Sequence, residues 1–222
     1  MRRKEQVTSI LDLITYDLDD MLAQFPVTLR NHSRRVAICA SVMAEYADEF
    51  LRFSYDMPTR MHLAPTVHLG GTCHDIGKIM LPLLLTEKEA YTRHPIIGAQ
   101  LLEQKKGDIF DNDIQAQIAL DMIRYHHERP DGAGFPTGLK AAKIPVPVGI
   151  CTLADWLDHR LSLGHESWSD IDSVINEVAS QTGTLFCESA VDCFNRAWPR
   201  LAAQYIKWDT RATPNTVFQP AI

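Results

Sequence analysis

Three short segments of the sequence carry histidines in arrangements that metal chemistry uses. The doublets are His74 with Asp75 in CHDIGK and His126 with His127 in HHERPDGAGFP, and His94 begins the segment HPIIG. Imidazole together with carboxylate suits Mn, Fe, Zn and Co better than Ca or Mg, which prefer shells of oxygen ligands. A carboxylate beside a histidine can bridge two metal ions while the imidazole holds one of them. The arrangement therefore indicates a metal site.

The other histidines and carboxylates are interpreted from their surroundings. His32 lies on an apolar stripe, where a single histidine is more often a hydrogen-bonded core residue than a ligand. His62 and His68 have no acidic or histidine neighbour, so we expect structural or surface roles for both. Asp155 lies within the apolar segment CTLADWL, where a carboxylate is costly unless it is paired or binds a metal. The roles of His159 and His165 are left undecided.

Helical periodicity dominates the chain. Apolar residues recur at intervals of three and four in five segments, 7 to 22, 32 to 46, 114 to 125, 148 to 161 and 191 to 205. No alternating strand pattern is found. Residues that interrupt helices are concentrated in a polar stretch from 49 to 60 and in a Gly/Pro-rich loop from 129 to 147. Loops as long as the second are usually functional in compact domains. The sequence therefore predicts one all-α domain built as a helical bundle with a long Gly/Pro-rich loop.

Composition excludes several classes of function. The 222 residues carry 22 Lys and Arg against 28 Asp and Glu, a net charge of −6 without a basic block, which argues against nucleic-acid binding. The longest apolar stretch is interrupted by Pro82 and is far shorter than the roughly 20 residues that span a bilayer. Acidic residues interrupt the N-terminal segment, and five scattered cysteines are expected to be buried thiols, so we expect a cytoplasmic protein with no membrane contact.

The sequence resembles the HD-GYP family, a branch of the HD metal-dependent phosphohydrolases, over about residues 31 to 194. The resemblance rests on NHSRRVA, HDIGK, HPIIGAQLL, HHERPDGAGFPTGL, IPVPVGICTLADWLDH and GTLFCESAVDCF. HDIGK alone indicates only the HD superfamily, whereas a histidine doublet followed by E-x-x-D-G-x-G-[YF]-P is much more specific. The resemblance implies an HD-type domain over 31–206, preceded by an N-terminal helix and linker over 1–30 and followed by a tail over 207–222.

The same resemblance implies a set of metal ligands. One metal would be held by His32, His74 and Asp155 and the other by His94, His126 and His127, with Asp75 bridging the two. Family members with a third metal use a glutamate one helical turn before the first histidine, where this chain has Thr28. Two divalent transition-metal ions are therefore expected, Fe or Mn in preference to Zn, Co or Ni.

The implied activity is hydrolysis of cyclic di-GMP to linear pGpG by a metal-dependent phosphodiesterase. A hydroxide bridging the metals would attack phosphorus, with Asp75 and Lys78 as the catalytic residues. Lys78 lies four residues after His74 and matches a family lysine that contacts the substrate phosphate. No residue identifies itself from the sequence as the acid that protonates the leaving 3′ oxygen.

Departures from the family pattern fall on residues that would bind the substrate. The signature tyrosine is Phe135, which keeps the ring and loses the hydroxyl, and the Lys-Pro-Gly turn usual before the third histidine is missing. Basic residues expected after the last aspartate are replaced by Gly164 and Ser167, with Arg160 and His165 as the nearest substitutes. Arg160 is therefore a candidate for binding the substrate.

The signature loop is expected to be held by its own residues. It comprises Glu128, Asp131, Gly132, Gly134, Phe135 and Pro136. Gly132 and Gly134 would supply backbone freedom, and the Phe135 ring would pack the loop. Glu128 and Asp131 are expected to bind loop amides and neighbouring side chains rather than metal.

Two alternatives stay open because the departures spare the metal ligands. The same site could act on another cyclic dinucleotide or on a nucleotide phosphate, or the chain could be a catalytically weak signalling module that binds metal or nucleotide. About 30 residues precede His32, too few for a sensory domain, so a separate regulatory protein or substrate supply is expected to control activity. The oligomeric state is left open.

Overall fold

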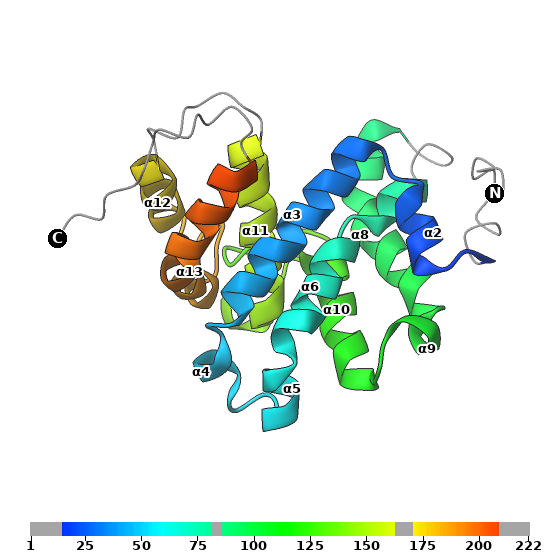
Figure 1. The fold of residues 1–222 in the computed structure, drawn as a ribbon, viewed down its shortest axis with the longest axis horizontal. Helices are drawn as coiled ribbons and strands as arrows, with labels where there is room; N and C mark the ends of the chain where they lie inside the picture. Colours follow the sequence, from blue (N-terminus) through cyan, green and yellow to red (C-terminus); the bar gives the residue numbers. More distant parts are fainter. Residues whose placement is uncertain (1–14, 81–85, 163–170, 209–222) are drawn as a thin grey trace.

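The computed structural model describes residues 15–80, 86–162 and 171–208, and these residues form helices and no strand (Figure 1). The predicted all-α fold is thereby confirmed. The longer helices are α3 (Val27–Ala44), α6 (Leu63–Cys73), α8 (Glu87–Glu103), α10 (Asp113–Tyr125), α11 (Val146–Ser162), α12 (Ile171–Ser180) and α13 (Glu188–Trp208). The shorter helices are α2 (Leu18–Ala23), α4 (Asp48–Leu51), α5 (Met57–Met61), η1 (Ile76–Met80), α9 (Lys106–Ile109) and η2 (Ala141–Lys143).

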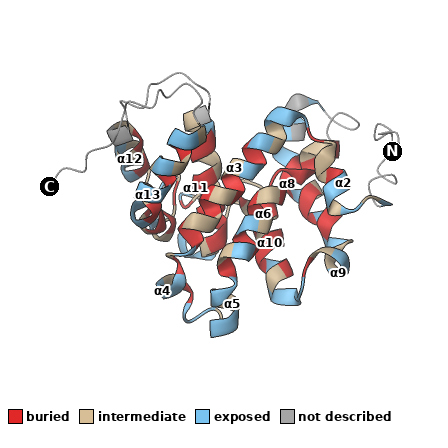
Figure 2. Cartoon of the chain, in the orientation of Figure 1, coloured by how far each residue is buried: buried red, intermediate tan, exposed pale blue. Residues whose placement is uncertain are grey.

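Helix α3 runs obliquely through the middle of the view in Figure 1 and packs against α6, α11 and α13. Helix α10 packs against α6, α8 and α11, so that α3, α6, α10 and α11 form the centre of the bundle. The buried residues lie on the faces that these helices turn toward one another (Figure 2). Burial of these apolar stripes is the main force that holds the helices together.

The buried apolar residues fall into two hydrophobic clusters. The larger joins α3, α11, α12 and α13, as in the contacts of Val36, Leu153 and Phe194. The smaller joins α2, η1 and α8 and includes Met21 and Leu102. Helices α6 and α10 contribute residues to both clusters. A site built at the ends of α6 and α10 is therefore positioned by both halves of the core.

The start of the chain differs from the sequence prediction. A continuous helix from 7 to 22 is wrong, because the backbone is extended at Asp17 (φ −73°, ψ 175°), and residues 1–14 lie outside the described part. The Asp17 side chain accepts a hydrogen bond from the amide of Asp20 at 2.7 Å and so begins α2 at Leu18. Aspartate is a strong N-cap residue, and capping competes here with helix continuation.

Two further boundaries differ in detail. Helix α3 ends at Ala44, so Tyr46 lies beyond the helix that its spacing had suggested. The polar stretch from 49 to 60 contains most of α4 and α5 rather than loop alone. Helix α5 begins after Asp56, which caps the amide of Thr59, and has Pro at its first turn.

A close backbone approach places η1 against α8. A Cβ atom on Gly77 would lie 2.0 Å from the carbonyl oxygen of His94 and 2.7 Å from the amide nitrogen of Gly98. Only glycine permits this contact. The contact fixes the HDIGK segment beside the helix that carries His94.

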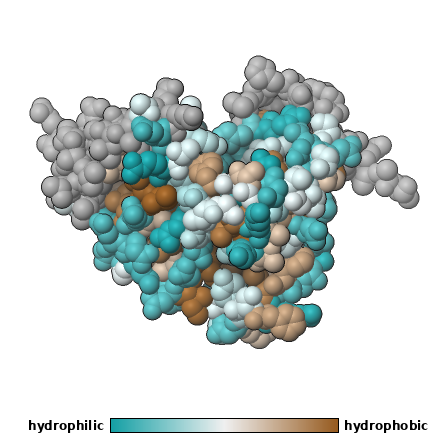
Figure 3. Space-filling model, turned by 180° about the vertical axis from the view of Figure 1, so that it is seen from behind, coloured by the Kyte–Doolittle hydropathy of each residue, from teal (hydrophilic) through white to brown (hydrophobic). Residues whose placement is uncertain are grey.

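None of the described helices is long and apolar enough to cross a bilayer. On the face opposite to that of Figure 1, hydrophobic residues form separate areas between hydrophilic ones (Figure 3). Four of the five cysteines are buried and Cys187 is partly buried, all as free thiols. The predicted thiol state is confirmed.

Candidate metal centre

The predicted ligands converge on one place in the bundle. His32 comes from α3, His94 from α8 and Asp155 from α11. His74 and Asp75 lie between α6 and η1, and His126 and His127 directly follow α10. The residues buried completely or nearly so are His32, His74, Asp75, His94 and His126. The structure therefore brings together all seven residues that the sequence singled out.

The two carboxylate oxygens of Asp75 face different groups of histidines. Asp75 Oδ1 lies 3.1 Å from His94 Nε2 and 3.9 Å from His126 Nε2. Asp75 Oδ2 lies 3.4 Å from His74 Nε2 and 3.8 Å from His32 Nε2. This is the arrangement that a carboxylate bridging two cations requires.

Asp155 completes the group of side chains around Asp75 Oδ2. Its Oδ1 atom lies 3.1 Å from His32 Nε2 and 3.7 Å from His74 Nε2. Two separate trios of ligand atoms, each within 4.8 Å of one another, are His32 with His74 and Asp155, and His94 with His126 and His127. A third trio, His74 with Asp75 and His126, links them through the central carboxylate.

Backbone carbonyls set the orientation of three imidazoles. His74 Nδ1 lies 2.8 Å from the carbonyl oxygen of Gly71. His94 Nδ1 lies 2.7 Å from the carbonyl oxygen of Tyr91, and His126 Nδ1 lies 3.0 Å from that of Ile123. A carbonyl oxygen only accepts, so Nδ1 carries a proton in each ring. Each Nε2 atom is thereby turned toward Asp75, the orientation that metal-binding histidines usually have.

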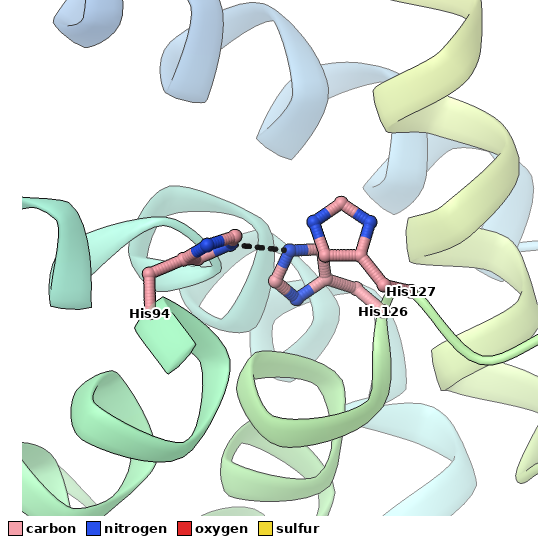
Figure 4. Close-up of side chains that lie close together, drawn as sticks. All are labelled: His94, His126 and His127. Atoms are coloured by element: carbon pink, nitrogen blue, oxygen red, sulfur yellow. Dashed lines mark hydrogen bonds between the residues drawn. The ribbon is translucent and has the colours of Figure 1, made fainter. Parts of the chain in front are cut away.

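His94 and His126 place two imidazole nitrogens where one cation could bind both. Their Nε2 atoms lie 3.3 Å apart and point toward each other, with His127 beside them (Figure 4). Burial, followed by the neighbouring histidines, holds the pKa of His126 well below its ordinary value, so this ring is neutral. Because Nδ1 of His126 donates to the carbonyl of Ile123, Nε2 of this neutral ring presents its lone pair toward His94. A metal ion between the two Nε2 atoms could bind both.

Other buried polar atoms of the centre also lack partners. Among the described residues, no hydrogen bond of acceptable geometry reaches His32 Nε2, His74 Nε2, His127 Nε2, Asp75 Oδ1 or Asp155 Oδ1. Buried polar atoms are almost always satisfied in proteins. Imidazole nitrogens and carboxylate oxygens are ligands for divalent transition metals, so the donor set fits such ions.

Electrostatics keep both carboxylates ionised. Burial raises the pKa of Asp75, but His74 and His94 outweigh it and hold that pKa well below the ordinary value. Burial likewise raises the pKa of Asp155, and His159, His32 and His74 lower it well below its usual range. His74 in turn loses basicity by burial, but Asp75 and Asp155 raise its pKa to about 10. Ionised carboxylates are the form that binds metal.

Asp158 and Arg35, which the sequence did not single out, hold the His32 side chain in position. Asp158 Oδ2 accepts a hydrogen bond from His32 Nδ1 at 2.8 Å, which leaves His32 Nε2 facing the centre. The carboxylate also forms two hydrogen bonds with the Arg35 guanidinium, at 2.6 and 2.9 Å. Asp158 is three residues after Asp155 and hence on the same face of α11, which is the signal that could have identified it.

His159, undecided from the sequence, lies beside the centre. Its Nδ1 is 3.1 Å from Asp155 Oδ1, and its ring centroid is 4.5 Å from that of His32. Asp155 raises the pKa of His159 to about 9 against the opposing effect of burial. The other undecided histidine, His165, lies outside the described residues, as do Gly164 and Ser167.

Glu128 holds the signature loop in place. Its buried carboxylate accepts hydrogen bonds from the amide and hydroxyl of Thr137 at 2.7 and 2.8 Å and from the amide of Leu139 at 2.8 Å. Asp131 accepts from the amide of Ala133 at 2.9 Å. Both side chains thus bind loop groups, as the sequence led us to expect.

The loop packs directly on the metal centre. The backbone at Gly134 approaches the carbonyl of His127 so closely that a Cβ atom would lie 2.5 Å away, whereas Gly132 has a positive φ of 80°. The Phe135 ring centroid lies 4.6 Å from that of His127. Pro136 follows in the same partly buried stretch. The aromatic ring of the signature therefore packs against a predicted ligand.

The two predicted substrate-binding cations differ in position. Lys78 Nζ lies 2.6 Å from Asp75 Oδ2, at the centre itself. Arg160 turns to α12, where its Nε donates to Glu177 at 2.9 Å and its Nη2 to Ser173 at 3.4 Å. Arg160 is thus held against α12 in this structure, and its role in substrate binding stays a prediction.

Comparison with known families assigns the chain to a class. The model of the HD domain family matches residues 29–160, which include all seven residues of the centre. The chain therefore belongs to the HD domain family. Membership of this family implies binding of divalent metal, which the His and Asp clusters described above could hold.

Curated relatives are more specific. The chain is 36% identical over 146 residues to the cyclic di-GMP phosphodiesterase response regulator RpfG of Xanthomonas campestris pv. campestris, covering 61% of this chain and 37% of the relative. It is 31% identical over 138 residues to a cyclic di-GMP phosphodiesterase of Thermotoga maritima, covering 58% and 36%. A 3'3'-cGAMP-specific phosphodiesterase 2 of Vibrio cholerae is 26% identical over 154 residues, covering 63% and 28%. The chain thus spans little more than a third of the length of the first two relatives, and their names agree with the HD-GYP resemblance.

Proposed function

We propose that this chain is a metal-dependent phosphodiesterase that hydrolyses cyclic di-GMP to linear pGpG. The observation that carries the proposal is the position of Asp75, whose two oxygens face two separate groups of imidazole nitrogens. The names of the relatives support the reaction and the substrate. The metal ligands proposed are those of the two trios, with Asp75 as the bridge.

Two divalent transition-metal ions are proposed as cofactors, with Fe or Mn favoured. Each trio supplies at least two imidazoles, which suits these ions better than Mg or Ca. Bound there, the metals would supply Lewis acidity toward a phosphoryl group and hydroxide at neutral pH. Asp75 would bind both ions through its two oxygens, and the hydrogen bond of His32 Nδ1 with Asp158 leaves His32 Nε2 placed to bind one of them.

The protein's own residues would then bind and orient the phosphodiester. Two divalent cations outweigh the charges of Asp75 and Asp155, so a negatively charged protein would have a positive site that attracts an anion. Lys78 is partly exposed and adds a cation beside Asp75. We propose that its ammonium group binds a non-bridging oxygen of the phosphate as charge develops there.

A second candidate function keeps the metal centre and changes the substrate to another cyclic dinucleotide. Two relatives from Vibrio cholerae are named 3'3'-cGAMP-specific phosphodiesterases. The ion pair of Arg160 with Glu177 favours this candidate, because it competes with binding of the second phosphate of cyclic di-GMP. A catalytically weak module that binds metal or nucleotide is the remaining alternative.

The test is to purify the protein without oxygen, quantify Fe, Mn and Zn, and follow cyclic di-GMP and 3'3'-cGAMP by chromatography in the same preparation. About two metals per chain with linear pGpG as the faster product would support the proposal. Faster cleavage of 3'3'-cGAMP would favour the second candidate, and two metals without cleavage of either would favour the binding module. His68→Ala serves as a control variant and should keep the metal content and activity of the unsubstituted protein, because His68 lies outside the ligand trios.

A further inference from the structure

Tyr91 contributes an aromatic ring beside the metal centre that no predicted role accounts for. It lies on α8 one turn before His94, and 53% of its surface is exposed. Its ring centroid lies 5.3 Å from that of His127 and 5.5 Å from that of Phe135. Because His127 and Phe135 also contact each other, the three rings form one continuous aromatic wall, defined here as Tyr91, His127 and Phe135.

The Tyr91 hydroxyl is available to a ligand. Among the described residues it makes no hydrogen bond, whereas the Tyr91 carbonyl accepts from His94. Burial raises the pKa of Tyr91, Asp155 and Asp75 raise it further, and Lys78 lowers it. The Tyr91 ring centroid also lies 6.1 Å from that of His94, so the side chain borders the histidines of the centre on two sides.

The ring of the signature loop supplies no hydroxyl at this position. Phe135, on the same wall, has a ring without a hydroxyl, and Arg160 is engaged with Glu177. A phosphate oxygen only accepts hydrogen bonds, so a phenol that contacts it must act as donor. Tyr91 can supply that hydrogen bond without adding charge to a site that already holds Lys78.

We propose that the Tyr91 hydroxyl donates a hydrogen bond to a non-bridging phosphate oxygen of the substrate and so positions the phosphodiester against the metal centre. The proposal rests on the proposed function in one respect, namely that the ligand is a phosphoester. Tyr91 thus takes over on α8 the hydroxyl that Phe135 lacks in the signature loop. Its backbone carbonyl orients His94, and its side chain binds the substrate.

The substitution Tyr91→Phe isolates the hydroxyl, because it keeps the ring and the carbonyl that holds His94. A hydrogen bond to a charged group contributes enough for about a tenfold change in affinity. We expect Tyr91→Phe loaded with Mn²⁺ to bind inorganic phosphate about tenfold more weakly by calorimetry, with unchanged metal content and melting temperature. We also expect KM for cyclic di-GMP to rise by a similar factor, with a smaller change in kcat.

Two further variants sharpen the test. Tyr91→Phe combined with Phe135→Tyr returns a hydroxyl to the neighbouring ring of the wall and is expected to recover part of the phosphate affinity. Tyr55→Phe is the matched control. Tyr55 lines a pocket with Asp113 at the start of α10, about 18 Å along that helix from its His126 end, and should leave phosphate binding unchanged.

The outcomes separate this proposal from the proposed function. Equal phosphate affinity in Tyr91→Phe and the unsubstituted protein would overturn the role of Tyr91, as would an absence of phosphate binding in the Mn²⁺-loaded unsubstituted protein. Phosphate binding that depends on Tyr91, without hydrolysis of cyclic di-GMP, would overturn the proposed substrate and support the role of Tyr91.

Discussion

Asp158 offers the sharpest test of how the metal centre is built. Its carboxylate is buried and joins His32 Nδ1 at 2.8 Å to Arg35 at 2.6 and 2.9 Å. Asp158→Asn keeps the volume and one acceptor oxygen but removes the charge that binds both groups. Loss of an outer carboxylate of this kind typically lowers metal affinity about 10- to 100-fold. We expect that loss at the trio containing His32 and not at the trio containing His94.

The assay is titration of the metal-free protein with Mn²⁺ against a chromophoric chelator. Unsubstituted protein should take up two ions, and Asp158→Asn should bind one of the two about 10- to 100-fold more weakly. Unfolding by urea measures the structural part separately. The lost charge-assisted hydrogen bonds to a partly exposed Arg35 should lower the free energy of unfolding by about 1–3 kcal/mol.

Asp192→Asn is the matched control, because Asp192 also pairs with an arginine, Arg196, at 2.9 Å but lies on α13 outside the ligand trios. It should leave both ions bound with unchanged affinity. If Asp158→Asn also bound two ions as tightly as the unsubstituted protein, the reasoning that Asp158 orients His32 for metal binding would be refuted.

Three further substitutions test other parts of the centre. Asp75→Ala should lose both metals together, because Asp75 faces both groups of histidines, and retention of two ions by metal analysis would contradict the bridge. Gly77→Ala should lower the melting temperature and the metal content, since its Cβ would lie 2.0 Å from the His94 carbonyl, whereas Gly107→Ala, with no atom within 4 Å, should do neither. Glu128→Ala should lower the free energy of unfolding in urea by about 2–4 kcal/mol, because loop donors lose their acceptor, and an unchanged midpoint would dismiss that role.

The sequence predicted the helices best where apolar periodicity was long. Helices α10 and α11 begin and end within two residues of the predicted segments. The start of α2 was not foreseen, because a side-chain cap at Asp17 decides it and periodicity continues across the break. The short helices α4 and α5 were also missed, since four or five residues carry too little of the helical period to show.

The candidate site was predictable to the extent that its residues are local in sequence. The doublets at His74 and His126 were visible because adjacent ligands form a motif. The partnership of Asp158 with His32 joins residues 126 positions apart and depends on the packing of α11 against α3. The contact of Tyr91 with Phe135 depends in the same way on how the loop folds back over α8.

The metal centre also joins the two hydrophobic clusters of the core. His32 and Asp155 come from helices of the larger cluster, and His94 comes from a helix of the smaller one. Bound ions would therefore hold the two clusters together. A ligand that binds only the folded state raises the free energy of unfolding by about 2.7 kcal/mol at a free concentration 100 times Kd. A change of that size alters the steady-state abundance of a protein several-fold in cells. Metal supply would therefore influence the abundance of the folded protein as well as its activity.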